Sequence, residues 1–211
     1  DFVLFWDKDL SLDLRIEKAV IRVFNSARAI ELCDDKTLTA DTLSGKVKMP
    51  ETLIAPKTFE GVKITDEFLI KAEKTFGFPM VVKEAFGSFG KQVYLVKNRE
   101  ELRNIVDKIG FKPFLIQEYI KSSCGRDVRV YVVGDKVVCR MLRVNKNDFR
   151  SNVSGGGEAF PFEENAEIDN AALLACRALG TDFAGVDVMF GENSPVVCEV
   201  NSNPHFRSAL T

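Results

Sequence analysis

The chain has 211 residues, is 45% hydrophobic, and carries 29 basic against 31 acidic residues for a net charge of -2. A chain of this size can bury roughly 70% of its unfolded surface, which excludes a disordered protein. The balanced charge provides no bulk field for nucleic acid or an anionic membrane, so we expect neither as a partner and look for local anion-binding sites.

The cysteines and the apolar runs indicate in which cellular compartment the protein is expected. The five cysteines show no CxxC or other metal-ligand spacing, and their odd number argues against a closed disulfide framework. No apolar stretch approaches the ~20 residues of a membrane span, and no signal-peptide pattern opens the chain. We therefore predict a protein of the reducing cytoplasm. Cys139, Cys176 and Cys198 lie in apolar runs, where we expect them to pack rather than to react.

The first predicted element is a buried strand over Phe2-Val-Leu-Phe-Trp6, which would need partner strands that nothing upstream supplies. We therefore expect a domain to be missing before residue 1. Residues up to about 60 alternate short apolar runs with helix-like stretches. This entry segment ends in Met49-Pro50 through Pro56, where proline breaks regular structure.

A helix, a strand, a glycine loop and a second strand come next. Thr65-Asp-Glu opens a helix whose apolar residues recur at helical spacing until Gly77 stops it. The strand Phe78 to Lys83 leads into Gly87-Ser-Phe-Gly90, and the alternating run Gln92 to Val96 leads out. This order indicates two strands joined by a loop that carries two glycines.

The rest of the chain predicts a second amphipathic helix and several more strands. Asn98-Arg-Glu-Glu101 resembles a capping box in front of a helix that ends before Gly110. The further expected elements are strands at Phe114 to Ile120, Val128 to Val133, Lys136 to Leu142 and within 185 to 201, a hairpin at Gly134-Asp135, and a helix near Asp169 to Leu179. Helices and strands interleave without strict βαβ regularity, which favours an α+β fold with largely antiparallel sheets.

The last two strands bring polar groups together. The run Val196 to Asn201 alternates, so Val197, Glu199 and Asn201 are expected on one face and Cys198 on the other. The neighbouring run 185 to 190 carries a single carboxylate, that of Asp187. We expect the two strands to be neighbours, so that their polar groups converge.

Two carboxylates and an amide, without histidine or thiolate, favour a hard cation. Mg2+ commonly takes one or two carboxylates while substrate phosphates complete its octahedron. Asp187, Glu199 and Asn201 therefore predict a site for Mg2+, or for Mn2+, beside a nucleotide. A surface hairpin whose acids face water stays open as the alternative.

The glycine loop is a candidate phosphate site. Between two strands, residues 87 to 91 can bend over a phosphate, because glycine lets backbone N–H groups approach oxygen without a Cβ clash. A plain turn is the alternative, since no Walker lysine-serine pair follows. Lys83 ends an apolar strand just before the loop, where it either snorkels at the strand edge or meets an anion.

Two further segments carry polar candidates. Gln117-Glu-Tyr-Ile120 can present its backbone and Glu118 to an adenine edge, with Asp127 near the ribose, although a simple strand exit explains the same residues. The stretch Arg143 to Asn152 is cationic and can clamp phosphates. A solvated basic loop remains possible there, because Asp148 mutes the local field.

Taken together, seven motifs resemble those of the ATP-grasp superfamily, in the same order. They are Val82-Lys83, Gly87-Ser-Phe-Gly90, Gln117-Glu-Tyr-Ile120, Gly125-Arg-Asp-Val-Arg129, Asp148-Phe-Arg-Ser-Asn152, Gly185-Val-Asp187 and Glu199-Val-Asn201. Within the superfamily the chain is most similar to RimK-like glutamate ligases, whose Asp-Phe-Arg-Ser-Asn and Glu-Val-Asn segments match letter for letter. The resemblance runs from about residue 20 to 204.

The resemblance implies an ATP-grasp fold, in which two α+β subdomains with mainly antiparallel sheets grip ATP between them. A smaller N-terminal domain normally precedes them, so residues 1–20 are expected to be its remnant or a linker. Residues 21–211 would form the ATP-grasp domain. Within it, about 50–122 would be the first nucleotide-gripping subdomain and about 123–211 the metal-binding subdomain.

The resemblance also implies a set of site residues. The cofactor-binding residues would be Lys36, Lys83, Gly87, Ser88, Phe89, Gly90, Lys91, Glu118, Tyr119, Ile120, Asp127, Ser151 and Asn152, the catalytic residues Arg143 and Arg150, and the metal ligands Asp187, Glu199 and Asn201. Arg150 is the first choice for stabilising the transferring phosphoryl group.

The implied activity is an ATP- and Mg2+-dependent ligase that joins a carboxylate to an amine through an acylphosphate, with an amino acid such as glutamate as one substrate. Its partners would be small-molecule or peptide acids and amines. The alternatives are an ATP-grasp enzyme with a thiol or bicarbonate partner, and a non-catalytic ATP-binding regulatory module. Association into a homo-oligomer also stays open, because an apolar first strand would be exposed.

One segment departs from the family pattern. Such ligases usually follow Glu-Val-Asn with a small residue, Ser, Pro and Gly, whereas this chain continues as Ser202-Asn-Pro-His-Phe206. We expect this segment to face the acceptor. His205, the only histidine, either binds or deprotonates an incoming amine or is a packed or solvated loop residue.

Overall fold

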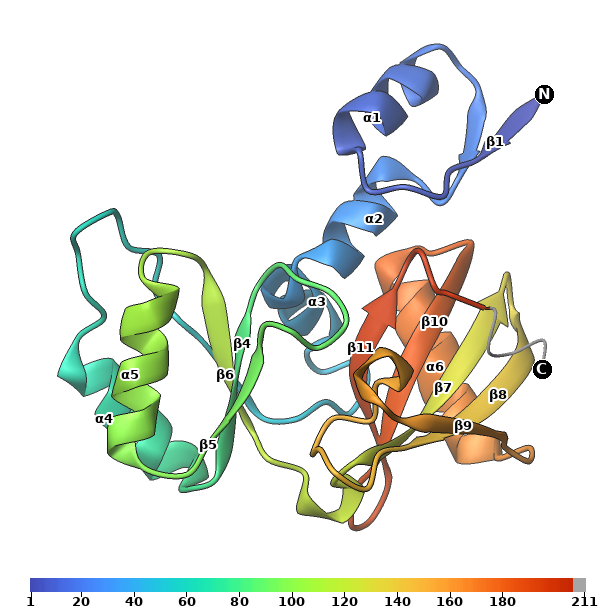
Figure 1. Cartoon of the computed structure of the whole chain (residues 1–211). Helices are drawn as coiled ribbons and strands as arrows, with labels where there is room; N and C mark the ends of the chain where they lie inside the picture. The colour runs from blue at the N-terminus through green and yellow to red at the C-terminus, as the bar shows by residue number, and fades with distance from the viewer. Residues whose placement is uncertain (207–211) are drawn as a thin grey trace.

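The computed structural model describes residues 1–206 as two sheets with helices packed on them and a small N-terminal unit above (Figure 1). The elements in chain order are β1 Phe2–Leu4, α1 Leu10–Lys18, β2 Arg22–Phe24, α2 Ala27–Asp34, α3 Lys36–Leu43, β3 Thr52–Ile54, α4 Asp66–Phe76, β4 Met80–Glu84, β5 Val93–Val96, α5 Arg99–Ile109, β6 Phe114–Glu118, η1 Lys121–Ser123, β7 Arg126–Val133, β8 Lys136–Val144, η2 Val153–Gly155, β9 Glu158–Pro161, α6 Ala166–Leu179, β10 Phe183–Phe190 and β11 Pro195–Asn201. No helix within the described residues is long and apolar enough to cross a membrane.

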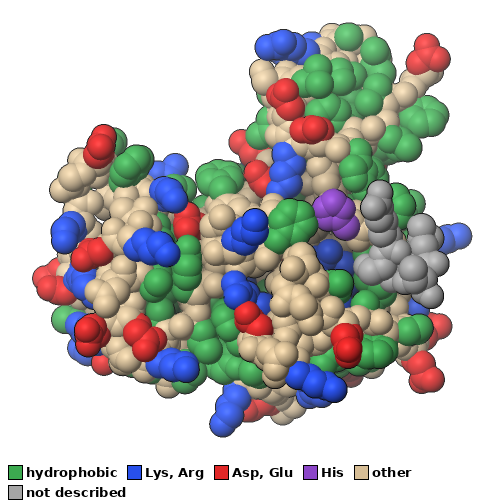
Figure 2. Space-filling view, in the orientation of Figure 1, with side chains coloured by type: hydrophobic (Ala, Val, Ile, Leu, Met, Phe, Trp, Pro, Cys, Tyr) green, Lys and Arg blue, Asp and Glu red, His purple; other side chains and the backbone are tan. Residues whose placement is uncertain are grey.

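The N-terminal unit corrects the expectation of a buried first strand. β1 pairs in parallel with β2 in a two-stranded sheet, and Val3 and Phe5 face a small core. Phe2 and Leu4 point the other way and are 64% and 63% exposed. A two-stranded sheet covered on one face can bury only every second side chain. Figure 2 accordingly shows hydrophobic side chains gathered on this unit, at the top of the view.

A single buried amide ties the N-terminal unit to the five-stranded sheet. The side chain of Asn25 donates to the carbonyl oxygens of Phe183, at 2.8 Å, and Ser202, at 3.1 Å. Its own oxygen accepts from the backbone N–H groups of Asp182, at 2.6 Å, and Phe183, at 3.1 Å. Nearby, the Trp6 ring stacks on the Phe183 ring with centroids 4.9 Å apart. The unit is thereby fixed to the start of β10 and to the end of β11.

The sheet on the left of Figure 1 is antiparallel, with strand order β3-β6-β4-β5, and α4 and α5 share its core. The predicted positions of both helices are confirmed. Asn98 caps α5, because its side-chain oxygen accepts from the N–H of Glu101 at 2.9 Å, and Gly77 follows α4 with φ +66. β3 was not predicted. It is an edge strand, where neighbouring prolines remove no interior ladder bond.

The sheet on the right is also antiparallel, with order β11-β10-β7-β8-β9. Its core packs against α6 and against residues of α2 and α3, which sequence analysis had left in an undivided entry segment. α6 begins at Ala166, ahead of the expected Asp169, because the side chain of Asn165 caps the N–H of Ile168 at 3.1 Å. β9 was not predicted, and the last residues of the proposed metal-binding subdomain, 207–211, lie outside the described residues.

Candidate active site

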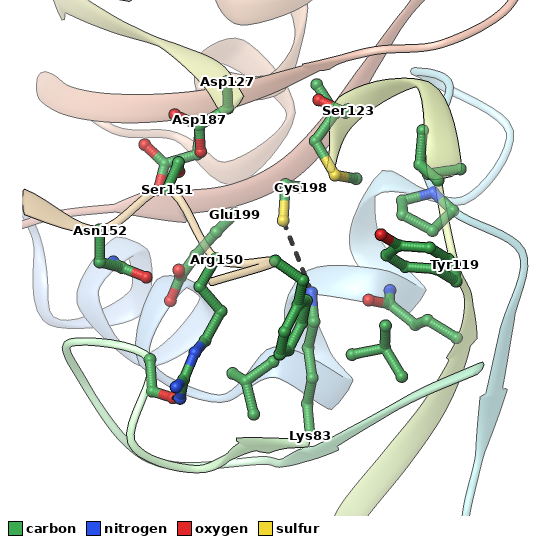
Figure 3. Close-up of a pocket in the computed structure, with 18 of the residues that line it drawn as sticks. Lys83, Tyr119, Ser123, Asp127, Arg150, Ser151, Asn152, Asp187, Cys198 and Glu199 are labelled. Atoms are coloured by element: carbon green, nitrogen blue, oxygen red, sulfur yellow. Dashed lines mark hydrogen bonds between the residues drawn. The ribbon is translucent and has the colours of Figure 1, made fainter. Parts of the chain in front are cut away.

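A cleft between the two sheets gathers most of the predicted site residues (Figure 3). β4 and the β4–β5 loop line one wall, and β7, β8, β10, β11 and the 149–152 segment line the other. The predicted residues on its surface are Lys36, Lys83, Gly87, Ser88, Gly90, Glu118, Tyr119, Ile120, Asp127, Arg143, Arg150, Ser151, Asn152, Asp187 and Glu199. Phe89, Lys91 and Asn201 line adjoining hollows instead.

Lys83 is a buried cation without a carboxylate partner among the described residues. It stands in β4, is only 8% exposed, and its Nζ lies 3.5 Å from the Cys198 sulfur (Figure 3). Within residues 1–206 it forms no ion pair. A buried ammonium with no counter-charge is unfavourable, so this arrangement suits an anionic ligand. Snorkelling at the strand edge, the other interpretation of Lys83, does not fit a side chain so well covered.

The glycine loop is held at both of its ends by cationic side chains from outside its own sheet. Lys36, at the start of α3, donates from Nζ to the carbonyl oxygen of Gly87 at 3.0 Å and lies 3.7 Å from Glu199 Oε1. Arg150 Nη1 donates to the carbonyl oxygen of Gly90 at 2.6 Å. A Cβ on Gly90, whose φ is +71, would stand 2.8 Å from the Asn152 side-chain oxygen. A larger residue at this position would displace the Asn152 side chain and would have to adopt a left-handed backbone conformation that favours glycine.

Arg150 is also bound to its own loop. Its Nε and Nη2 donate to the two carboxylate oxygens of Asp148 at 3.0 and 2.6 Å. This hydrogen bonding holds the pKa of Asp148 below its ordinary value. The guanidinium thus joins Asp148 to the glycine loop, and a phosphate would meet a fork that is already oriented.

The predicted metal ligands lie on paired strands. β10 and β11 are antiparallel, Asp187 pairs with Glu199, and Gly185 pairs with Asn201. The ladder shifts register after Asp187, since Val188 pairs with Val197 and Cys198 is left over as a bulge.

The bulge corrects the predicted alternation. Val197 is fully buried in the core, whereas Cys198 lines the cleft next to Glu199. The expectations that Val197 would share the face of Glu199, and that Cys198 would pack on the opposite face, were therefore wrong. An extra residue in one strand rotates the residues before it, so strict period-2 alternation fails at that point.

The strongest polar network of the site is built around Asp187. Arg129 donates from Nε and Nη2 to its two oxygens at 2.6 and 2.7 Å, and Arg143 Nη2 lies 2.9 Å from Oδ2. Arg143 also forks onto Asp127 at 2.7 and 2.5 Å. Burial alone would raise the pKa of Asp187, but Arg129 and Arg143 outweigh it and hold that pKa below its ordinary value.

These residues fit a hard cation that shares its ligands with a phosphate. A carboxylate can accept about four hydrogen bonds or ligands, so Asp187 Oδ1, with one donor, keeps a free position. No group of three or more His, Cys, Asp or Glu side chains within residues 1–206 is arranged to hold a metal by itself. Asp187, Glu199 and the amide of Asn201 would leave the remaining positions to water and phosphate oxygens, as Mg2+ prefers.

The opposite end of the cleft offers hydrogen-bonding groups. Glu118 is occupied, since its carboxylate accepts from the N–H of Glu51 at 2.9 Å. Gln117 donates to the Thr52 hydroxyl at 2.8 Å, but its buried side-chain oxygen has no partner among the described residues. Burial raises the pKa of Tyr119 to about 12, so its hydroxyl stays neutral at ordinary pH.

Several lining residues were missed from the predicted site, among them Arg129, Gln117, Ser123, Arg126, Met189 and Cys198. A signal for Arg129 was present, because Asp127 and Arg129 stand two apart on a strand and therefore share a face. In the structure Arg129 pairs directly with Asp187 across the ladder. Gln117 stood inside a quoted motif, but only its neighbours were assigned to the site.

A second cavity of about 420 Å³ adjoins the cleft and shares Gly87, Ser88, Asn152 and Glu199 with it. The other lining residues include Trp6, Lys8, Asp34, Phe89, Arg129, Asn201, Ser202, Asn203 and His205. Lys8 and Asp34 form an ion pair within it. The expectation that residues 202–206 face an acceptor remains a prediction, and these residues line this cavity up to His205.

Comparison with known proteins identifies the fold and then the family. The D-alanine–D-alanine ligase of Bacillus anthracis complexed with ATP matches with a TM-score of 0.75 at 22% identity, over 96% of this chain and 66% of that chain. The fold is therefore the α+β ATP-grasp fold. Residues 33–209 match the RimK-like ATP-grasp domain, and the chain belongs to that family of carboxylate-amine ligases.

Two relatives match this chain at higher sequence identity. An uncharacterized protein of Mycoplasma pneumoniae, the MG012 homolog, is 33% identical over 95% of this chain and 72% of its own length. Beta-citrylglutamate synthase B of Danio rerio is 35% identical over 95% of this chain and 49% of its own length. The chain thus spans about half the length of this synthase.

Proposed function

We propose that this chain carries the ATP- and Mg2+-binding site of a ligase that forms an amide bond between a carboxylate and an amine. The observation that carries the proposal is Lys83, a buried cation without a carboxylate partner in residues 1–206, facing a pair of carboxylates across the same cleft. A polyphosphate with a divalent cation matches both walls at once, because its phosphates suit the lysine and its metal suits the acids.

The residues divide the chemistry between them. Lys83, Lys36 and the glycine loop would bind the phosphates, and Arg150 would stabilise charge on the transferring group. When bound, magnesium supplies charge neutralisation at phosphate oxygens, and Asp187, Glu199 and Asn201 would hold it.

No protein nucleophile is needed. A substrate carboxylate oxygen attacks the γ-phosphorus while the bond to ADP breaks, which gives an acyl phosphate. The amine then attacks the acyl carbon, the C–N bond forms as the C–O bond to phosphate breaks, and the amine nitrogen loses a proton. Positioning and charge neutralisation account for catalysis of this kind.

Similarity to beta-citrylglutamate synthase supports an amino acid such as glutamate as the amine substrate and a small carboxylic acid as the acid, with a peptide acid as the second candidate. The test is to incubate the protein with Mg-ATP, candidate acids and hydroxylamine, which traps an acyl phosphate as a hydroxamate. We expect hydroxamate and ADP in equal amounts with the correct acid. Absence of ADP release with every acid would count against a ligase.

Glu199→Gln separates a ligase from a module that only binds nucleotide. The substitution removes one negative charge from the predicted metal site while the side chain keeps its size. In a ligase, turnover in the hydroxamate assay should fall by roughly a hundredfold or more, since metal charge at the reacting phosphate is lost. In a binding module only nucleotide affinity, measured by calorimetry, would change.

A further inference from the structure

The loop between β4 and β5 separates the two cavities of the site. Gly87 and Ser88 line both, whereas Phe89 lines the second cavity and not the cleft. In Figure 1 this loop arches from the left-hand sheet toward β11. The loop tip therefore forms part of the wall of the second cavity.

Phe89 has an unfavourable backbone conformation that directs its ring to a specific partner. Its φ is +59, in the left-handed region that residues with a Cβ seldom occupy. The ring is half exposed, and it stacks on the imidazole of His205 with centroids 5.6 Å apart and planes 28° apart. A bulky residue in this conformation is expected only where surrounding contacts maintain it, and the stack supplies such a contact.

The position of His205, the partner of Phe89, is fixed by contacts with the five-stranded sheet. The Tyr131 hydroxyl donates to the backbone carbonyl oxygen of His205 at 2.6 Å. The preceding Pro204 packs so closely on Gly185 of β10 that a Cβ on this glycine would stand 2.7 Å from the Pro204 Cβ. His205 is thus a fixed platform on the five-stranded sheet, and Phe89 reaches it from the other sheet.

We propose that Phe89 and His205 are positioning residues whose stack holds the loop tip over the second cavity. The ends of the loop are fixed by Lys36 and Arg150, through the carbonyl oxygens of Gly87 and Gly90. The stack is a third contact, and it joins the tip itself to the five-stranded sheet. A closed tip excludes water from the place where an acyl phosphate would meet the amine, so it favours amide formation over hydrolysis back to acid and phosphate.

The inference rests on the proposed ligase function, but one test of it needs no substrate. Trp6, the only tryptophan, lines the second cavity and is 47% exposed, so the covered part of its ring reports access to that space above a baseline of direct exposure. Acrylamide quenching of Trp6 is measured in the wild type, Phe89→Ala, His205→Ala, the double variant and His205→Phe. Phe111→Ala, a loss of another half-exposed phenylalanine outside both cavities, is the matched control.

We expect the quenching constant to rise by about a third in each single alanine variant and no further in the double variant, because both changes remove one shared contact. His205→Phe, which keeps a flat ring, should restore the wild-type value, and Phe111→Ala should leave it unchanged. Additive effects of Phe89→Ala and His205→Ala, or an unchanged quenching constant in both, would overturn the inference.

A second readout uses the acid found by the hydroxylamine screen. His205→Ala should raise the ADP released per hydroxamate formed by about threefold, with nucleotide affinity unchanged, since an open cavity admits water. His205→Phe should again behave as wild type. A wild type that makes no hydroxamate contradicts the ligase itself, whereas an active wild type with an unaffected His205→Ala contradicts only the role of the stack.

Discussion

The two walls of the cleft differ in whether their buried charged side chains are paired. On the five-stranded sheet, the buried ionic groups satisfy one another, since Arg129 and Arg143 fork onto Asp187 and Asp127. On the four-stranded sheet, Lys83 is similarly well covered, but among the described residues its ammonium hydrogen-bonds only to a thiol. On one wall the buried charges are paired within the protein, whereas on the other the buried Lys83 has no carboxylate partner among residues 1–206.

This difference separates residues that maintain the site from residues that bind. A buried pair that loses one partner leaves the other charge uncompensated, so the network on β7, β8 and β10 should govern stability. An unpaired buried cation destabilises the free protein slightly and is compensated only by a ligand, so Lys83 should govern affinity. Substitutions on the two walls are therefore expected to have effects of different kinds.

The largest expected effect is that of Arg143→Met, which strips Asp127 of its ion-pair partner. We expect the free energy of unfolding in urea to fall by about 3–5 kcal/mol. The matched control is Arg177→Met, because Arg177 pairs with Asp135 at the exposed surface, where loss of the pair should cost about 1 kcal/mol or less. Equal losses in the two variants would show that the network does not hold this wall together.

Lys83→Met should act in the opposite direction. We expect the free protein to be as stable as the wild type or slightly more so, while affinity for Mg-ATP falls by about ten- to a hundredfold, the worth of a charge-assisted contact. Calorimetric titration and thermal unfolding with and without nucleotide measure both quantities. Lys97→Met, at an exposed position outside the cleft, removes the same charge as a control. If the two variants bind Mg-ATP equally well, Lys83 is not the phosphate contact.

The smallest expected effect concerns the stability of the fold at acidic pH. Because the pKa of Asp187 is lower in the folded protein than in the unfolded chain, its ion pairs stabilise the fold above the unfolded value of about 3.9. That stability should disappear as the pH falls through the lower folded value. Unfolding free energies measured between pH 7 and 3 should fall more steeply below about pH 4 in the wild type than in Asp187→Asn. Parallel curves would contradict a lowered pKa for Asp187.

Much of the fold followed from local patterns. The Asn98 cap of α5 and the glycines that end α4 and α5 are encoded next to the helices, and the alternation in β7 and β8 is set within each strand. The bulge at Cys198 could not be predicted in this way, because it exists only relative to the register of β10. The same holds for β3 and β9, short edge strands defined by the strands that they join.

The site shows the same division between local and long-range information. The order of the motif residues along the chain predicted which side chains line the cleft, and most of the predicted side chains do line it. Which of those side chains are already bound to each other depends on contacts such as Arg150 with Gly90, sixty positions apart. The assigned roles of the site residues, the subdomain boundaries and the cytoplasmic location stay predictions.

The four hydrogen bonds of Asn25 have a mechanical consequence. They connect the N-terminal unit to one end of the strand pair that carries Asp187 and Glu199, where β10 begins and β11 ends, so we expect this unit and the five-stranded sheet to move together. Any hinge that opens the cleft must then lie where the chain passes between the sheets, around residues 44–51 and 119–125. The four-stranded sheet, with α4 and α5, is the part that would swing, and it would carry Lys83 with it.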